Sequence, residues 1–449
     1  MDGSWKIALA LLIVSMICLG AGSDHPLGIF GNANMDGTID EKDVAYVEGI
    51  IKGANAATNL SDANYDSKID AQDIELIEQI IHGEEKELTL LDAYDTVVTI
   101  RKPLERIIVE GDNNAELMRI LRSENKIVAV FGEPSEIQFP EFSNLPNLGD
   151  ALVNPDYEAI LSANPDLLLT FGAKTTDSEK KKKLPGVAVV FLGLLFPDLY
   201  PNPENSQYLD GVRKLGYILD KEDEAEEYIQ WYLGWINKIK SRTETIPVDE
   251  RPRVLVCNNP KNETSKFRAY AKMDTLAQMC LLAGGKNIAE NIPEFVGTKD
   301  ALEVETEWVI TQNPEFIFVH NAAYAPVHGY GADDPTGIGD PAGMKVIRDG
   351  LMNRSELSNV TAVETGDVYI MSGLFRNDGS GGLVGTAYMA KLLHPDLFED
   401  LDPEAIQQEY LKLQDFDFDL DEHGIIIYPP IEIDGGLAGI PDKYKGQAY

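Results

Sequence analysis

The stretch Lys221-Glu-Asp-Glu-Ala-Glu-Glu-Tyr-Ile-Gln-Trp-Tyr-Leu-Gly-Trp-Ile-Asn-Lys-Ile-Lys240 decides how the larger part of this chain folds. No proline interrupts it before Pro247, and acidic residues crowd its start and lysines its end, as a helix dipole prefers. Large side chains recur at steps of three and four and would share one helix face: Ala225, Tyr228, Trp231, Tyr232, Trp235 and Ile239. The stretch therefore predicts a helix of about 25 residues, roughly 37 Å long, enough to connect two lobes. We expect its aromatic stripe to pack in a core rather than to bind a ligand.

Strands and helices alternate on both sides of this helix, which predicts an α/β fold with largely parallel sheets. The expected strands cover 96–100, 107–110, 127–130, 167–170, 187–192, 254–257, 316–320 and 368–371. The expected helices cover 114–122, 157–163, 208–219, 275–283, 305–312 and 384–393.

Short segments in this region resemble a known family. Arg101-Lys-Pro103-Leu-Glu105-Arg106-Ile107-Ile108-Val109 is similar to the first strand of the cluster-type substrate-binding proteins of iron-complex and cobalamin ABC importers. Further matches follow in the family's order: Asn154 to Leu161, Asn164 to Leu169, Leu282 to Ala289, Glu305 to Phe318, and Ala362-Val363 with Gly366-Asp367-Val368-Tyr369.

The resemblance covers about Asp92 to Tyr410 and implies two α/β lobes with a periplasmic-binding-protein-like fold. The first lobe would span 92–220, a rigid interlobe helix 221–246 and the second lobe 247–410, with a ligand held in the cleft between the lobes. The C-terminal tail, 411–449, departs from the family pattern, and the sequence suggests no role for it.

A cleft between lobes takes its ligand contacts from loops that follow strand ends. Arginine and tyrosine suit an anionic chelate, and flat aromatic rings suit the face of a corrinoid or haem. For each residue the alternative is an ordinary loop side chain. The candidates are Asp112, Asn113 and Phe171 in the first lobe, and Arg268, Tyr270, His320, Tyr324 and Arg376, with Asn377 beside it, in the second.

Histidine and tyrosine gather at one place in the second lobe: His320, Tyr324, His328 and Tyr330. Imidazole and phenolate both bind iron, so the cluster could ligate iron or a haem. Its spacing matches no metal-binding motif, and a polar loop is the favoured interpretation.

The family docks its permease through one exposed acidic residue on each lobe, which faces arginines of the permease. By position, Glu307 is the candidate in the second lobe, and Asp177 or Glu179 in the first. Ordinary surface carboxylates are the alternative in so acidic a chain.

A repeat precedes the lobes. Asn32-Ala-Asn34-Met-Asp36-Gly37-Thr38-Ile39-Asp40-Glu-Lys-Asp43 recurs in register as Asp62-Ala-Asn64-Tyr-Asp66-Ser67-Lys68-Ile69-Asp70-Ala-Gln-Asp73. Calcium is a hard cation that takes six to eight oxygens from alternate residues of a tight loop, including one backbone carbonyl at position 7. The expected calcium ligands are Asn32, Asn34, Asp36, Thr38, Asp40 and Asp43 in the first loop, and Asp62, Asn64, Asp66, Lys68, Asp70 and Asp73 in the second.

Each loop runs into an apolar-periodic helix, and the whole, about Leu27 to Gly83, resembles a type I dockerin module. The resemblance implies a small all-α calcium-binding module over 24–86 that docks onto a cohesin domain. The cohesin contacts would be Glu41 and Lys42 in the first copy, and Ala71 and Gln72 in the second. An acidic, turn-rich linker is the alternative. A core this small predicts that the module is largely unfolded without two bound Ca²⁺ ions, and 84–87 would be a short charged joint.

The N-terminus reads as an export signal over 1–23, because Lys6 precedes an apolar run that is too short to span a bilayer. Cys18 invites a lipoprotein interpretation, but the bulky Ile17 before it makes lipidation the less favoured alternative. Of the two remaining cysteines, Cys257 and Cys280, buried free thiols are expected, with a disulfide as the alternative. The mature chain is expected to be secreted, and extracellular or associated with the cell surface.

The formal net charge of -37 over 449 residues argues against nucleic acid and anionic bilayers as partners. Motifs of hydrolases, phosphate-binding loops and metalloproteases are absent from the sequence, so we expect no enzyme. The leading hypothesis is an extracellular solute-binding protein of an ABC importer, which binds a ferric siderophore, haem or corrinoid and is tethered by the dockerin. Alternatives are a cellulosome-like structural or adhesive protein whose large domain binds a polymer or protein, and a nitrogenase-like enzyme, against which the lack of cluster-ligating cysteines speaks.

Overall fold

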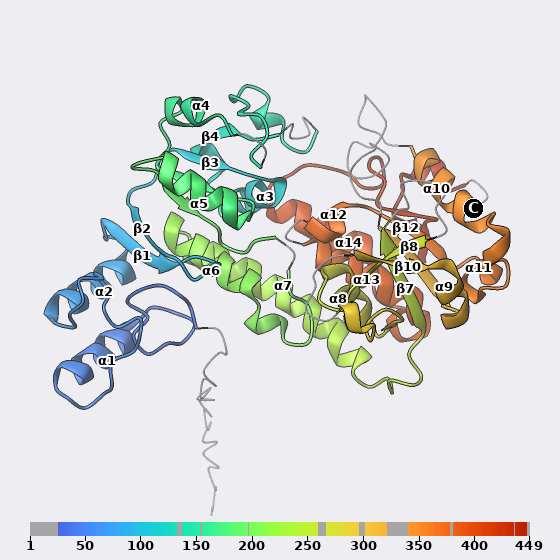
Figure 1. The fold of residues 1–449 in the computed structure, drawn as a ribbon, viewed down its shortest axis with the longest axis horizontal. Helices are drawn as coiled ribbons and strands as arrows, with labels where there is room; N and C mark the ends of the chain where they lie inside the picture. The colour runs from blue at the N-terminus through green and yellow to red at the C-terminus, as the bar shows by residue number, and fades with distance from the viewer. Residues whose placement is uncertain are drawn as a thin grey trace, which may run out of the picture.

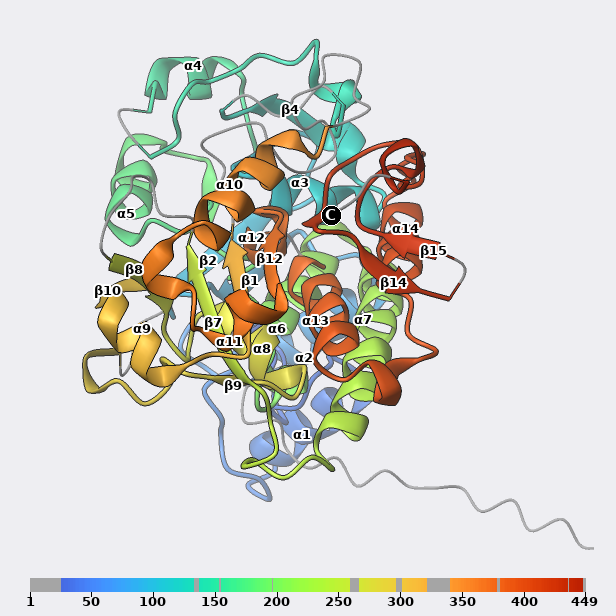
Figure 2. The ribbon, with the colours of Figure 1, turned by 90° about the vertical axis from the view of Figure 1, so that its right-hand side faces the viewer.

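The computed structural model describes residues 26–132, 137–152, 155–195, 197–258, 266–295, 301–320, 340–377, 380–434 and 436–446. They form an N-terminal module, a first lobe, a connecting helix, a second lobe and a C-terminal tail (Figure 1). Figure 2 shows the second lobe from its outer side. In this part of the chain, every helix is too short or too polar to cross a membrane.

The first lobe is built on a parallel sheet with the strand order β4-β3-β5-β6. Its strands are β3 (Ile107–Val109), β4 (Ile127–Val130), β5 (Leu167–Leu169) and β6 (Ala188–Val190). The helices of this lobe are α3 (Asp112–Ile120), α4 (Tyr157–Ser162), α5 (Lys174–Lys183) and α6 (Gln207–Leu219). The strands β3 and β5 are buried at every position, as expected for a parallel sheet that is covered on both faces.

The second lobe contains a mixed sheet with the strand order β10-β8-β7-β11-β12-β13, in which β9 also pairs with β7. The strands are β7 (Arg253–Asn258), β8 (Lys266–Tyr270), β9 (Lys286–Asn287), β10 (Ala301–Glu305), β11 (Phe316–His320), β12 (Val368–Met371) and β13 (Ile427–Tyr428). The helices are α8 (Thr275–Leu282), α9 (Thr306–Gln312), α10 (Ala342–Met352), α11 (Thr361–Thr365), α12 (Leu374–Asn377), α13 (Gly381–Leu393) and α14 (Pro403–Leu413). Its centre, β7-β11-β12, is parallel.

The predicted connecting helix is confirmed as α7 (Glu222–Thr243), which runs from the first lobe to the second (Figure 1). Its aromatic stripe packs, as expected. Tyr228 and Tyr232 are buried, and Trp231 and Trp235 are half-buried, each donating its indole N–H to Glu409 Oε2 on α14 at 2.9 Å.

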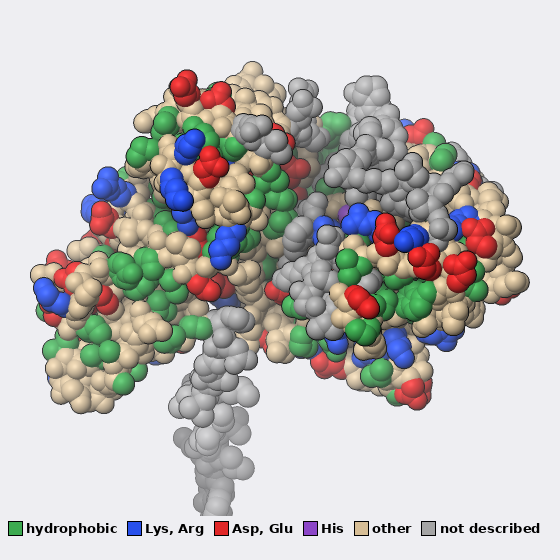
Figure 3. Space-filling model, in the orientation of Figure 1, with side chains coloured by type: hydrophobic (Ala, Val, Ile, Leu, Met, Phe, Trp, Pro, Cys, Tyr) green, Lys and Arg blue, Asp and Glu red, His purple; other side chains and the backbone are tan. Residues whose placement is uncertain are grey.

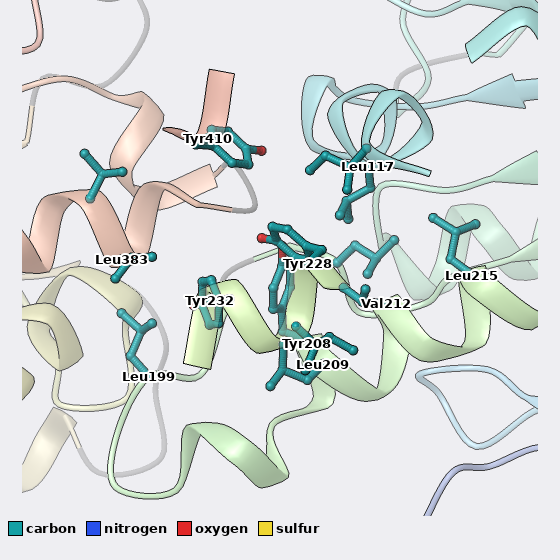
Figure 4. Packing of buried hydrophobic residues seen from close by; sticks show 14 of the residues in the cluster. Leu117, Leu199, Tyr208, Leu209, Val212, Leu215, Tyr228, Tyr232, Leu383 and Tyr410 are labelled. Carbon is teal, nitrogen blue, oxygen red and sulfur yellow. The ribbon is translucent and has the colours of Figure 1, made fainter. Parts of the chain in front are cut away.

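A continuous apolar core joins the two lobes around this helix (Figure 4). Leu117 of α3 belongs to it from the first lobe, and Leu383 of α13 and Tyr410 of α14 from the second. At its centre, the Tyr208 and Tyr228 hydroxyls share a hydrogen bond of 2.7 Å. The lobes are therefore held by packing as well as by the connecting helix.

The C-terminal tail, for which the sequence suggested no role, completes the second lobe. Its strand β13 pairs with β12 and extends the sheet, and β14 (Ile431–Ile433) and β15 (Gly436–Ala438) form a hairpin after it. The Gly439 N–H donates to Glu404 Oε2 at 2.8 Å and so fastens the tail to α14.

The N-terminal module consists of two loops with the helices α1 (Glu41–Ile51) and α2 (Ala71–His82). It is joined to the hairpin β1 (Glu87–Leu91) and β2 (Val97–Arg101) by a bridge between Ile29 and Leu90. The Ile39 N–H donates to the Tyr217 hydroxyl of α6 at 2.9 Å. The module therefore packs directly onto the first lobe.

The expected charged joint at 84–87 is instead part of this packed junction. Glu85 is buried, and Lys102 forms ion pairs with both Glu85 and Asp220. Lys102 also donates to the Tyr217 carbonyl at 2.8 Å. These contacts hold the end of the module against the start of the first lobe.

The expectation of buried free thiols is confirmed for Cys257 and Cys280. Burial raises the pKa of the Cys257 thiol to about 12. Both thiols are therefore protonated and poorly reactive at neutral pH.

Candidate functional site

The first-lobe side of the candidate site begins where β3 turns into α3. Gly111 has a φ of +83°, and a Cβ there would lie 2.6 Å from a ring carbon of Phe171. Glycine thus lets the half-buried Phe171, which follows β5, pack over the start of α3. Asp112 comes next, and its side chain is exposed. Asp112 and Phe171 therefore remain accessible to a ligand.

Asn113 has a different role from the predicted one. Its side chain is 3% exposed and donates to the Leu194 carbonyl at 2.9 Å. It therefore fastens the loop after β6 to α3. The prediction that Asn113 contacts the ligand is wrong, because its side chain is buried.

A buried ion-pair cluster supports this side of the site from below. Lys180 Nζ lies 2.6 Å from Glu110 Oε1 and 3.4 Å from Asp177 Oδ1, and all three side chains are nearly inaccessible. Burial raises the pKa of Glu110, and Lys180 opposes that rise. The second oxygen of Glu110 accepts the Phe171 N–H at 3.1 Å, so the cluster fixes the backbone that carries Phe171.

This cluster corrects one predicted docking residue. Asp177 accepts hydrogen bonds from Thr170 Oγ1 at 2.9 Å and from the Tyr94 hydroxyl at 3.2 Å. A carboxylate that is 2% exposed and already paired cannot face the arginines of a permease. Glu179, the alternative, is exposed, as is Glu307 on α9.

The second-lobe side is formed at the carboxyl ends of parallel strands. Asn258 of β7 and His320 of β11 are neighbours in register. Tyr270 of β8 reaches both, since its hydroxyl accepts from Asn258 Nδ2 at 3.0 Å and lies 2.9 Å from His320 Nδ1. Tyr270 and His320 are 1% and 4% exposed. These two predicted ligand contacts therefore lie beneath the surface and brace the strand ends.

Arg376 lies above this network. Its Nε and Nη2 donate to Asp274 Oδ2 at 3.0 and 2.7 Å, and its guanidinium carbon is 5.3 Å from the centre of the Tyr270 ring. Asp274 also caps the start of α8 through the Leu276 N–H. The charge of Arg376 is thus compensated within the protein, whereas its side chain keeps partial exposure.

Arg268 on β8 is exposed and donates to the Ala301 carbonyl at 3.2 Å. Tyr324, His328 and Tyr330 lie outside the described residues, as does the side chain of Asn377. Of the histidine and tyrosine cluster, for which a polar loop was the favoured interpretation, His320 alone lies in the part of the chain that the structure describes.

The two halves of the site face each other. Figures 1 and 2 place α3 and α12 next to one another, on the sides of the lobes that meet. Figure 3 shows the surfaces of the two lobes in the same view as Figure 1. The elements that carry Asp112 and Arg376, the start of α3 and α12, therefore lie on the facing sides of the two lobes, which makes these residues candidates for the walls of an interlobe cleft.

The loops of the N-terminal module form a second candidate site. In the first loop, the Asp36 N–H donates to Asn32 Oδ1 and Asn34 Oδ1 at 3.1 and 2.9 Å, and the Asn34 N–H donates to Asp43 Oδ1 at 3.0 Å. The oxygens of three predicted ligands thus turn into the loop.

The second loop repeats this pattern. The Asp66 N–H donates to Asp62 Oδ1 and Asn64 Oδ1 at 3.0 Å each, and the Asn64 N–H donates to Asp73 Oδ1 at 3.3 Å. Ser67, which stands in the place of Gly37, has a left-handed φ of +72°, whereas Gly37 is not among the residues with a positive φ. The two loops therefore share these hydrogen bonds but differ in backbone conformation at this position.

Asp43 and Asp73 close the loops onto their helices. Each accepts the N–H of the helix-capping residue, Asp40 or Asp70, and completes a capping box. Both carboxylates are buried, and burial raises the pKa of Asp43 to about 6 and also raises that of Asp73. A cation in each loop would offset the cost of burying these charges.

The chemistry of the donors fits calcium, because carboxylate, amide and carbonyl oxygens are the ligands of a hard cation. Thr38 and Lys68 would contribute backbone carbonyls. Among the described residues, however, groups of three or more acidic, histidine or cysteine side chains do not converge closely enough to hold a metal by themselves. The amide and carbonyl oxygens would therefore be essential to either site. The predicted cohesin contacts, Glu41, Lys42, Ala71 and Gln72, are exposed.

Comparison with solved structures supports the two-lobed architecture. The TroA-like periplasmic binding protein FepB from Veillonella parvula matches with a TM-score of 0.60 at 18% identity, covering 77% of this chain and 99% of that one. A periplasmic solute binding protein from the same organism gives 0.56 at 19% identity, with 74% and 94% coverage. The molybdate-bound binding protein MolA of Haemophilus influenzae gives 0.55 at 18% identity, with 74% and 99% coverage.

A search of curated proteins gave no match. The family model described as periplasmic binding protein matches residues 113–373, more than half of the chain, and so covers parts of both lobes and the connecting helix. The two α/β lobes, their connecting helix and this match lead to one conclusion: the chain belongs to the periplasmic binding protein family.

Proposed function

We propose that this protein is the solute-binding component of an ABC importer and captures a metal chelate, such as a ferric siderophore, haem or corrinoid. The proposal rests on the different side chains that the two lobes bring to the candidate cleft. The first lobe carries the exposed carboxylate of Asp112 and the half-buried ring of Phe171, and the second carries the partly exposed guanidinium of Arg376 on α12 and the exposed Arg268 on β8. The binding proteins FepB and MolA share the fold, and MolA was solved with molybdate.

The residue types favour a chelate over a simple apolar solute. Guanidinium groups recognise carboxylate, catecholate or phosphate groups through directed hydrogen bonds, and an aromatic ring packs on a flat ligand. The buried network of Tyr270 and His320 beneath Arg376 holds these groups in place before the ligand arrives. Such preorganisation raises affinity by reducing the entropy lost on binding.

The proposal is tested by native mass spectrometry and tryptophan fluorescence against ferric siderophores, haem and cobalamin. We expect one ligand per chain, and a loss of about tenfold in affinity for Arg268→Ala, the cost of one charge-assisted hydrogen bond. Arg253→Ala is the matched control. Arg253 is exposed on β7 and pairs with Glu315, which precedes β11. This pair lies at the amino ends of β7 and β11, whereas the candidate cleft lies at their carboxyl ends. Failure of every ligand to bind, or equal losses in the two variants, would reject the proposal.

The N-terminal module binds two Ca²⁺ ions and tethers the protein to a cohesin domain in this proposal. Its support is the set of corresponding hydrogen bonds in the two loops, the buried carboxylates of Asp43 and Asp73, and the exposure of the four cohesin-contact positions. A protein tethered in this way acts outside the cytoplasm.

Isothermal titration with calcium tests the module, with Asp36→Ala combined with Asp66→Ala as the variant. We expect two ions per wild-type chain and no tight binding in the variant. Glu75→Gln, an exposed acid on α2, is the control for the change in net charge. Retention of both ions by the double variant would show that the loops are not the calcium sites, without bearing on the cleft.

Docking onto the permease is assigned to the exposed carboxylates of Glu179 and Glu307, one on each lobe. Charge reversal at either position, Glu179→Lys or Glu307→Lys, should slow import into vesicles that contain the permease while ligand affinity stays unchanged. Unchanged import in both variants would exclude these two residues.

A further inference from the structure

A second link between the lobes lies in the connection from β6 to α6. Both of these elements belong to the first lobe, yet the residues between them contact the second lobe before the chain returns. We call residues 193–195 and 197–200 the crossing segment. These residues form neither helix nor strand, so the position of the crossing segment depends on the side chains that bind it.

The first-lobe end of the crossing segment is bound to α3. The Asn113 side chain donates to the Leu194 carbonyl at 2.9 Å, and both residues are buried. Asn113 directly follows Asp112, the exposed candidate for ligand contact in this lobe. The crossing segment is therefore attached one residue away from the first-lobe wall of the candidate cleft.

The other end of the crossing segment is bound to α8 of the second lobe. Gln278 Oε1 accepts the N–H groups of Leu199 and Tyr200 at 2.6 and 3.0 Å. One turn earlier on the same helix face, Thr275 Oγ1 donates to the Pro197 carbonyl at 3.2 Å. Gln278 and Thr275 are 5% and 1% exposed. Two buried side chains of α8 therefore hold the backbone of the crossing segment at three places.

Apolar packing holds this end as well. Leu199 is fully buried in the core that the two lobes share, near Leu383 of α13 (Figure 4). A Cβ at Gly382 would lie 2.9 Å from Leu199 Cδ1, so the glycine lets Leu199 pack directly on α13. Polar and apolar contacts with the second lobe thus act on the same residue.

The attachment to α8 also lies next to the second-lobe wall. Asp274, which directly precedes Thr275 and caps α8, accepts from Nε and Nη2 of Arg376 at 3.0 and 2.7 Å. Arg376 is the partly exposed candidate for ligand contact on α12. The crossing segment is thus attached beside each of the two candidate walls, at Asn113 in one lobe and at Thr275 in the other.

We propose that the crossing segment sets the separation of the two candidate cleft walls, and that Gln278 is the positioning residue that fixes this separation. The inference rests on the proposed function, because it gives Gln278 control over the size of chelate that the cleft accepts. Walls that are fixed in place before the ligand arrives reduce the entropy lost on binding. They also discriminate against chelates that are too small to reach both walls or too large to enter.

The distance between the lobes, measured without any ligand, is the first test. Nitroxide labels are attached through Glu158→Cys on α4 and Val346→Cys on α10, which are exposed positions on the two lobes (Figure 1). The labels do not reach the native thiols of Cys257 and Cys280, which are fully buried, and Cys18→Ser removes the third native thiol.

Pulsed electron paramagnetic resonance of the labelled protein gives the distribution of interlobe distances. We expect a narrow distribution for the labelled parent protein. Gln278→Leu removes both hydrogen bonds to the Leu199 and Tyr200 N–H groups at similar side-chain volume, so we expect a broader distribution in this variant.

Ligand discrimination is the second test. Ferrichrome, haem and cyanocobalamin, which differ in size, are titrated by tryptophan fluorescence. We expect Gln278→Leu to bind the preferred chelate about tenfold more weakly and the other two with smaller changes, so that discrimination among them falls. A residue that contributed to stability alone would leave this discrimination unchanged.

Gln408→Leu is the matched control. The Gln408 amide also binds two backbone groups of a distant segment, the Phe418 carbonyl at 2.7 Å and the Leu420 N–H at 3.4 Å, but both belong to the tail. We expect this variant to keep the interlobe distances and the discrimination of the wild type. Thr275→Val, which removes a single hydrogen bond at similar volume, takes the place of Gln278→Leu if that variant does not fold.

The outcomes separate this inference from the proposed function. A broader distance distribution and weaker discrimination in Gln278→Leu, with both unchanged in Gln408→Leu, support the role of Gln278. A distribution as narrow as that of the parent protein, equal broadening in the control, or unchanged discrimination overturns it. If none of the three chelates binds to the wild type, the proposed function fails, and the distance distributions alone decide whether Gln278 fixes the separation of the walls.

Discussion

The Tyr410 hydroxyl donates a hydrogen bond of 2.8 Å to Glu116 Oε2, and so joins the last helix of the second lobe to α3 of the first. The other oxygen of Glu116 accepts from Gln138 Nε2 at 2.8 Å, and Glu116 is fully buried. A carboxylate in that position depends on its hydrogen bonds for solvation. The contact therefore fastens the lobes at the level of their shared core.

Replacing Tyr410 by phenylalanine removes this bond without changing the packing of the ring. We expect Tyr410→Phe to lower the free energy of unfolding by about 1–3 kcal/mol, because a buried carboxylate oxygen loses a partner. Urea denaturation followed by tryptophan fluorescence measures the change. Tyr46→Phe is the control, since its hydroxyl makes an exposed bond of 3.3 Å to the Ala56 carbonyl. Equal effects of the two substitutions would contradict the assignment.

Lys180 beneath the cleft should tolerate substitution poorly. Lys180→Met leaves Glu110 and Asp177 buried without their cation, so we expect a loss of about 3–5 kcal/mol in unfolding free energy. Lys183→Met, which breaks an exposed contact with Glu179 at 3.6 Å, should cost less than about 1 kcal/mol. Adding Glu110→Gln to Lys180→Met should restore part of the stability, and a further loss in the double variant would refute the explanation.

The pH dependence of stability should carry a contribution from Glu404. Burial raises its pKa from 4.5 to about 7. The folded state then binds more protons than the unfolded state between these values, so stability falls as the pH rises from 4.5 to 7 and is constant above. The contribution is at most about 3 kcal/mol, from the size of the shift. Glu404→Gln should flatten this part of the curve in urea denaturation at successive pH values, and a slope identical to that of the wild type would exclude Glu404.

Gly111 should be required for the first-lobe wall of the cleft. In Gly111→Ala the new Cβ would meet the Phe171 ring at a positive φ, so we expect a loss of about 1–3 kcal/mol in stability and weaker ligand binding. Gly350→Ala is the matched control in α10, where the added Cβ meets no atom within 4 Å, and stability should be unchanged or slightly higher. If Gly111→Ala binds the ligand with wild-type affinity, the position of the Phe171 ring does not depend on this glycine.

The elements that the sequence predicted well are those whose signal is local. The helix α7 was readable from its periodicity and charges, and the strands β4, β11 and β12 have the predicted bounds because each is a short apolar run. The helix α5 was missed, since Lys174–Lys183 carries no apolar periodicity and is anchored instead by the burial of Lys180. The strands β8 and β10 were missed because they pair with each other across a long separation.

The sequence predicted where along the chain the candidate site residues lie, but not which of their side chains are exposed. The turns after β3 and β5 and the ends of β7 and β11 could be located from the order of strands. That Asn113, Tyr270 and His320 point inward depends on partners from distant segments, such as the Leu194 carbonyl and Asn258. Asp274 was missed as the partner of Arg376, although its place before α8 marks it as a helix cap.

The way in which the N-terminal module is seated has a mechanical consequence. Because Ile29 pairs with Leu90 and Ile39 bonds to Tyr217, the module moves with the first lobe and lies on the side of it that is remote from the second lobe (Figure 1). A large protein bound at Glu41 and Lys42 would therefore hold the molecule at one end. The second lobe lies at the other end of the molecule and would stay clear of that protein.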